Sequence, residues 1–185
     1  MNAFRMARRS GVPLRALREA LLQTFLFAGY PRTINALDAL EEALGPLRSE
    51  LPEMLPSGPA RRNRLRRRGL ALFQRVYGDD AGRVLARIGR QHLEFRDWIV
   101  VDAYGKVLGR PGLTDAEREC ISVGLLATLD LPRQLVPHVR GALRCGAVVE
   151  EVEAALEGVT GVASRKSITF ARRRLKIETA PPPVG

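Results

Sequence analysis

Apolar residues recur every three or four positions along most of the chain, and no segment alternates convincingly between apolar and polar residues. This spacing places side chains on one face of an α-helix, so the pattern predicts an all-α fold. In the clearest case, a helix that opens at Pro13, one apolar face forms and Gly29 follows as a stop. That face consists of Leu14, Leu17, Leu21, Phe25 and Ala28.

Prolines and glycines divide the chain into predicted regions. Residues 1–44 carry a lead-in turn and two helices, the second opening at Pro31, and are predicted to form an N-terminal helical half-repeat. The next segment, 45–60, is rich in proline and glycine and predicts a linker. The main domain is predicted over 61–178, and a disordered tail with three consecutive prolines over 179–185.

Within the main domain, helix signals are frequent. Thr114 with Glu117 three residues later is a capping box, which predicts a helix from Thr114 to about Leu129. Pro132 opens the next helix and Gly146 is its natural stop. The other predicted helices span about 61–77, a short stretch after Asp80, 92–108, 148–162 and 164–177, and the core of 92–108 is expected to contain Phe95, Trp98, Ile99, Val101 and Leu108.

The two ends of the chain resemble each other. Residues 6–37 align without gaps to residues 141–172 at a constant offset of 135, with glycines meeting at Gly11 and Gly146. A helix, a glycine stop and two more helices then occur in the same order in both places. The sequence thus predicts an internal duplicated helical-hairpin repeat, against the alternative that two alanine-rich amphipathic hairpins agree by chance.

The charge of the chain does not by itself indicate a nucleic-acid-binding protein. The formal net charge is +10, and all but three of the 30 basic residues are arginines. Six arginines fall in the eight positions 61–68, yet they cover every face of a helix and no known nucleic-acid-reading motif is visible. The segment 111–161 instead holds four arginines against eight acidic residues. Nucleic-acid binding is therefore the weakest of the functional alternatives.

The two cysteines, Cys120 and Cys145, form no CxxC motif, and the sequence contains no zinc-type cluster of Cys and His. We expect no metal and no cofactor. The longest apolar stretch, 21–29, is far short of the roughly 20 residues that a bilayer requires. These features predict a cytoplasmic protein without a membrane partner.

From Arg110 onward the chain resembles the carboxymuconolactone decarboxylase family, which includes the alkylhydroperoxidase D-like proteins. The resemblance is carried by the runs RPGLTDAERE, LLATL and HVRGAL, followed by Gly146 and the acidic Glu150 and Glu151. It implies an alkylhydroperoxidase D-like helical bundle that works as a homo-oligomer with active sites near subunit interfaces. The segment upstream from Asp102 to Gly105 also looks like the aromatic-glycine segment of the decarboxylase branch.

In the peroxidase branch, the family signature is a Glu, then a CxxC pair, then a His with three residues between it and the second Cys. Glu119 and His138 keep the spacing of 19 residues, whereas Leu131 and Gln134 occupy the two cysteine positions. A redox dithiol needs two thiols. The resemblance therefore implies an acid–base pair without dithiol peroxidase chemistry.

The chemistry expected from these residues is proton transfer on a small organic acid or lactone. His138 is the candidate general acid, and Glu119 the group that orients it or relays its proton. Arg118 or Arg140 would supply a cationic donor, and Tyr104 would line the substrate pocket. Decarboxylation by a lyase is one outcome. The alternatives are a non-catalytic oligomeric binding protein on the same fold, and peroxiredoxin-type activity by family membership.

Overall fold

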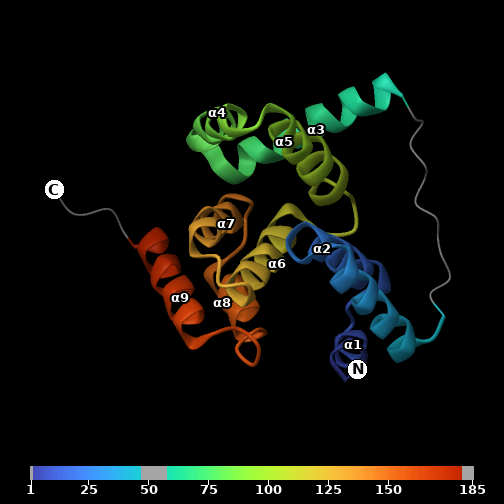
Figure 1. Cartoon of the computed structure of the whole chain (residues 1–185). Coiled ribbons are helices and arrows are strands. Elements are labelled where there is room, and N and C mark those ends of the chain that lie inside the picture. Colours follow the sequence, from blue (N-terminus) through green and yellow to red (C-terminus); the bar gives the residue numbers. More distant parts are fainter. Residues whose placement is uncertain (1, 47–57, 181–185) are drawn as a thin grey trace.

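The structure is a computed structural model that describes residues 2–46 and 58–180 (Figure 1). All regular elements in these two ranges are helical, as the sequence pattern predicts, and none of the helices is long and apolar enough to cross a membrane. The elements are α1 Asn2–Arg9, α2 Leu14–Leu44, α3 Pro59–Tyr77, η1 Gly78–Asp80, α4 Ala81–Gln91, α5 Leu93–Trp98, η2 Ile99–Leu108, α6 Asp115–Thr128, α7 Pro132–Arg144, α8 Val149–Glu157 and α9 Arg165–Thr179.

The predicted stop at Gly29 is present as a kink inside α2. Gly29 has φ 75° and ψ 176°, values that fall outside the helical region. Pro31 then opens the second arm, because a proline fits the first turn of a helix. The predicted linker falls mainly on residues 47–57 and the predicted tail mainly on residues 181–185, and both stretches lie outside the described residues.

Helix α6 lies at the centre of the bundle, with α2 on one side, α7 and α8 on the other, and α3 to α5 above it (Figure 1). The larger hydrophobic core lies between helices α6, α7, α8 and α9. Its fully buried members include Val123, Leu135, Val139, Leu156 and Ala171. A second cluster joins α3, α4 and η2 around Phe73 and Tyr104. Helix α7 packs on both α6 and α3 and so lies between the two clusters.

One stretch of predicted core is partly wrong. Val101 and Leu108 are buried in η2, but Phe95 and Trp98 in α5 are each 50% exposed. The sequence pattern predicts one helix over 92–108 with one apolar face. The chain instead forms a short α-helix followed by a π-helix, whose different repeat changes which residues face inward.

Helices α3 and η2 approach each other backbone to backbone. A Cβ atom added at Gly69 would lie 1.9 Å from the carbonyl oxygen of Val100, and one added at Gly105 would lie 2.3 Å from the carbonyl oxygen of Leu65. Both distances are far inside van der Waals contact. The two glycines therefore set the separation at which η2, and with it Tyr104, packs on α3.

We expect Gly69→Ala to destabilise the protein by about 1–3 kcal/mol, because the methyl group forces the two backbones apart. Urea denaturation followed by circular dichroism measures the change. Gly82→Ala is the matched control, since nothing lies within 4 Å of a Cβ at that helical position. A Gly69→Ala variant that is as stable as Gly82→Ala would contradict the close packing.

The internal repeat stays a prediction. Helices α1 and α2 match α7, α8 and α9 in order, and Gly11 and Gly146 both have positive φ, at 86° and 98°. However, the first arm of α2 runs unbroken to the kink at Gly29, whereas α8 has only nine residues. The two ends therefore share an order of elements and one glycine conformation.

Candidate functional site

Helix α6 begins where the sequence predicts, and this start positions Glu119. The Thr114 hydroxyl accepts a hydrogen bond from the Glu117 amide at 3.1 Å, and the Glu117 carboxylate accepts one from the Thr114 amide at 2.6 Å. This capping box confirms the prediction and fixes the first turn. Glu119 follows in the second turn with its side chain only 2% exposed.

His138 reaches Glu119 from the neighbouring helix. Helix α7 begins at Pro132 as predicted and continues through Pro137. The Nδ1 atom of His138 lies 2.7 Å from Oε2 of Glu119, and the imidazole side chain is 9% exposed. Because an ionised carboxylate can only accept, Nδ1 carries the proton of this hydrogen bond and Nε2 is left for other partners. The structure thus brings the predicted pair together in a buried position.

Gly141 makes room for this pair one turn further along α7. A Cβ atom at position 141 would lie 2.7 Å from Oε2 of Glu119 and 2.7 Å from Cγ1 of Val76. Only a residue without a side chain lets α7 pass this close to the carboxylate. The glycine in the HVRGAL run therefore has a direct role in the geometry of the site.

Two aromatic rings lie beside the imidazole. The rings of Phe27 from α2 and Tyr77 from α3 both lie edge-on to His138, with centroid distances of 6.3 Å and 6.4 Å. The Tyr77 and Tyr104 hydroxyl groups are 3.5 Å apart. Tyr104 was predicted from the sequence, whereas Phe27 and Tyr77 were not, because each comes from a helix far away in the sequence.

Both phenols stay protonated at neutral pH. Burial raises the pKa of Tyr77 by more than the hydrogen bond with Tyr104 lowers it, and the charge of Glu119 raises it further. Burial raises the pKa of Tyr104 well above its usual range, and the neighbouring Tyr77 and Glu119 act in the same direction. The two side chains are therefore neutral hydrogen-bond donors beside the acid–base pair.

Neither cysteine is an activated thiol, because the pKa of each is raised. Burial and three neighbouring glutamates raise the pKa of Cys120 to about 11. Burial, with Glu119 and Asp115 nearby, raises the pKa of Cys145 to about 12. A thiol with such a pKa is almost entirely protonated at neutral pH, and the thiol form is a poor nucleophile.

The two candidate arginines lie in other ion pairs. Arg118 is 1% exposed, and its Nη2 donates to Glu19 Oε2 at 3.0 Å and to the Arg110 carbonyl at 2.9 Å. Burial lowers the pKa of Arg118, an effect that its hydrogen bond to Glu19 opposes. Arg140 pairs with Glu178 at 2.9 Å near the surface. No hydrogen bond of the described residues joins either guanidinium to His138, so their substrate-binding roles stay predictions.

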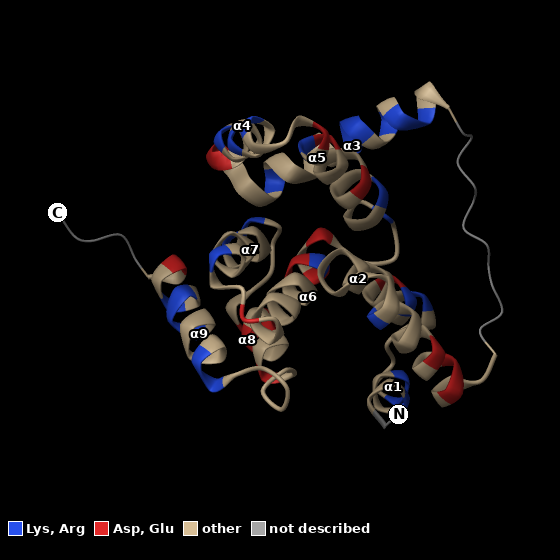
Figure 2. Ribbon diagram, viewed as in Figure 1, with Lys and Arg blue, Asp and Glu red and all other residues tan. Residues whose placement is uncertain are grey.

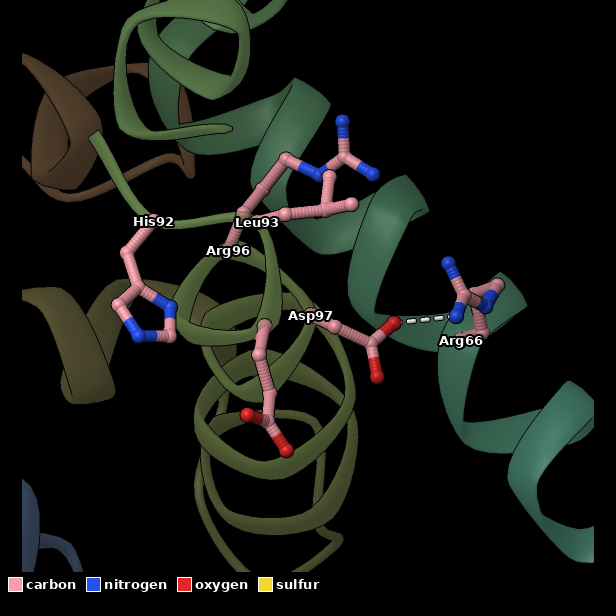
Figure 3. Close-up of a pocket in the computed structure, with 6 residues that line it drawn as sticks. Arg66, His92, Leu93, Arg96 and Asp97 are labelled. Atoms are coloured by element: carbon pink, nitrogen blue, oxygen red, sulfur yellow. Dashed lines mark hydrogen bonds and ion pairs between the residues drawn. The ribbon is translucent and has the colours of Figure 1, made fainter. Parts of the chain in front are cut away.

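Two surface cavities lie away from the pair. The larger, about 580 Å³, opens beside α3 and α5, where Arg66 forms an ion pair with Asp97 (Figure 3). It is lined by Arg66, His92, Leu93, Glu94, Arg96 and Asp97. The smaller, about 340 Å³, is lined by Asp130, Pro132, Lys166, Ser167 and Phe170. Neither cavity is lined by Glu119 or His138.

Arginines of the 61–68 run also have partners in the fold. Arg62 and Arg66 both form ion pairs with Asp97 of α5. Basic residues continue along α3 and α9 at the edges of the bundle (Figure 2). Two arginines of the basic run therefore form ion pairs that link α3 to α5.

Comparison with known proteins identifies the segment that contains the pair. Residues 98–171 match the model of the carboxymuconolactone decarboxylase family. This segment is similar to that family, and we call residues 98–171 the family domain. The family domain includes Tyr104, Glu119 and His138, whereas Phe27 and Tyr77 come from helices that precede it. No solved structure matches the chain.

Two curated proteins are similar to most of the chain. Peroxisomal protein 2 of Schizosaccharomyces pombe is 29% identical over 155 residues, which cover 83% of this chain and 71% of that protein. Peroxisomal protein 2 of Saccharomyces cerevisiae is 27% identical over 160 residues, which cover 74% of this chain and 56% of that protein. The similarity therefore extends well beyond the family domain.

Proposed function

We propose that the protein is an acid–base enzyme of the lyase type that acts on a small organic acid or lactone through His138 and Glu119. The observation that carries the proposal is the buried 2.7 Å contact between the imidazole Nδ1 and the Glu119 carboxylate. A carboxylate at Nδ1 orients the imidazole, which leaves Nε2 to exchange a proton with substrate. The similarity of residues 98–171 to the decarboxylase family supports this reaction class.

In a decarboxylation, the bond to the carboxyl carbon breaks and carbon dioxide leaves, while the electron pair stays on the substrate as a dienolate. Protonated His138 then delivers the Nε2 proton to carbon, and Glu119 stabilises the imidazolium before that transfer. The phenols of Tyr77 and Tyr104 are neutral donors that suit the developing oxyanion. A cationic contact from Arg118 or Arg140 would require that side chain to leave its present carboxylate partner.

Dithiol peroxidase activity has little support. Leu131 and Gln134 stand where the peroxidase branch has its cysteines, and the pKa values of Cys120 and Cys145 lie far above neutrality. Neither thiol has a second cysteine placed as CxxC to resolve a sulfenic acid. Peroxiredoxin-type activity thus rests on the similarity to the family alone.

A second candidate is a non-catalytic binding protein that assembles as a homo-oligomer. The low exposure of His138 and the position of both cavities away from it favour this alternative. A substrate site at a subunit interface would reconcile the buried pair with catalysis.

The names of the two relatives make a peroxisomal location an alternative to the predicted cytoplasm.

Glu119→Gln tests the enzyme against the binding protein. The amide keeps the shape of the side chain but removes the charge that stabilises the imidazolium. We expect carbon dioxide release from carboxymuconolactone and related small lactone acids to fall by about 10²-fold or more. Glu150→Gln, on the exposed first turn of α8, is the matched control and should keep the wild-type rate. Equal rates for wild type and Glu119→Gln would refute the assigned role.

A further inference from the structure

We propose that α2 forms a wall of the acid–base site, in which Phe27 covers the imidazole of His138 and acts as a positioning residue. This inference rests on the proposed function and adds residues that lie outside the family domain. The inference rests on a ring that lies edge-on to the imidazole and on two side chains that hold α2 against α6.

The first anchor is Gln23, which is completely buried. Its amide nitrogen donates to the Arg118 carbonyl at 2.7 Å and to the Ser122 hydroxyl at 3.0 Å. These acceptors belong to residues on either side of Glu119 along α6. A buried amide without such partners is costly, so the two hydrogen bonds fix the register of α2 on α6.

The second anchor is the carboxylate of Glu19, one turn before Gln23. It accepts hydrogen bonds from Arg110 at 2.9 Å and from Arg118 at 3.0 Å. Burial acts to raise the pKa of Glu19, but the two guanidinium groups outweigh this effect and hold the pKa below its ordinary value. The carboxylate is therefore charged at neutral pH and pairs α2 with the residue that precedes Glu119.

Phe27 lies one turn after Gln23, so the two side chains share a face of α2. Its ring meets the imidazole of His138 edge-on, with an interplanar angle of 72°. The ring also packs against the core formed by α6 to α9. Because both anchors lie on the same helix, the position of Phe27 over the imidazole is set by contacts made to the helix that carries Glu119.

The covering ring has two consequences for the reaction. It keeps water from one side of the imidazole, which strengthens the contact between Nδ1 and the Glu119 carboxylate. It also restricts the space beside His138 on the side that faces α2. Phe27 is thus a determinant of both proton transfer and substrate size.

Chemical modification tests the cover without a substrate. The chain has two histidines, and His92 is exposed while His138 is 7% exposed. Diethyl pyrocarbonate reacts with accessible imidazoles, and peptide mass spectrometry reports the two rates separately. In Phe27→Ala, we expect the ratio of the His138 rate to the His92 rate to rise by about tenfold, which corresponds to about 1.4 kcal/mol.

Three further variants complete the comparison. Phe27→Leu keeps an apolar cover and should restore a ratio near wild type. Tyr30→Ala removes an exposed aromatic ring from the same helix and should leave the ratio unchanged. Phe27→Val takes the place of Phe27→Ala if the alanine variant loses its helical circular dichroism spectrum, with the same expected direction.

An unchanged ratio in the folded Phe27→Ala or Phe27→Val variant would overturn the inference. So would a rise of equal size in Tyr30→Ala, because the effect would then not depend on the covering ring. The modification rates involve no turnover. Failure of this inference is therefore distinguishable from failure of the proposed acid–base function, which Glu119→Gln tests by activity.

Discussion

Glu19→Ala is expected to lower the free energy of unfolding by about 3–5 kcal/mol. The change removes the only carboxylate that pairs with Arg118 among the described residues, and Arg118 is 1% exposed. Its charge would then remain buried without a carboxylate partner. Arg110 is less affected, because its side chain is 27% exposed and can turn to water. Urea denaturation with circular dichroism measures the loss.

The same carboxylate predicts a pH dependence. The pKa of Glu19 in the folded protein lies below its ordinary value of 4.5. Its contribution is therefore complete above about pH 4.5 and is lost as the pH falls through the lower, folded-state pKa. We expect the wild-type free energy of unfolding to fall more steeply over that acidic range than that of Glu19→Gln. Parallel acid limbs would contradict this assignment.

Two variants show whether the loss comes from the buried charge. Glu153→Ala removes a carboxylate that pairs with Arg172 at 2.9 Å on the surface, and should cost at most about 1 kcal/mol. The double variant Glu19→Leu and Arg118→Met replaces the buried pair by apolar side chains, and should recover most of the stability. A Glu19→Ala variant no less stable than Glu153→Ala would contradict the account.

Local signals in the sequence predicted most helix boundaries. Thr114 with Glu117, Pro132 and the stop at Gly29 each act through neighbouring residues, and the structure confirms all three. The family spacing also predicted that Glu119 and His138 belong together, and the structure places them 2.7 Å apart. These successes share one cause, because each depends on residues close in sequence or on one fixed spacing.

The features that the sequence does not predict correctly depend on tertiary contacts. Trp98 was expected in the core, but the switch from α5 to a π-helix leaves it half exposed. Nothing local in the sequence indicates that Phe27 and Tyr77 are neighbours of His138, since 111 and 61 positions separate them from it. One signal was available: Gln23 is a polar residue inside the apolar run 21–29, and such a residue, when buried, needs a partner from another element.

His138→Asn is expected to lower kcat for carbon dioxide release from a responsive lactone acid by about 10²–10⁴-fold, the usual contribution of a positioned general acid. Asparagine can still donate a hydrogen bond to Glu119, so the packing of α7 on α6 is retained. Its amide does not exchange protons at neutral pH. The loss should therefore occur in kcat without a matching loss of folding stability.

The central claim is that His138, paired with Glu119, carries the proton-transfer step. The most direct test compares the rate of carbon dioxide release from carboxymuconolactone and a panel of small lactone acids for wild type, His138→Asn and His92→Asn. We predict turnover by wild type, an unchanged rate in His92→Asn and a loss of about 10²-fold or more in His138→Asn. Equal rates in all three proteins, or no turnover of any member of the panel by wild type, would contradict it.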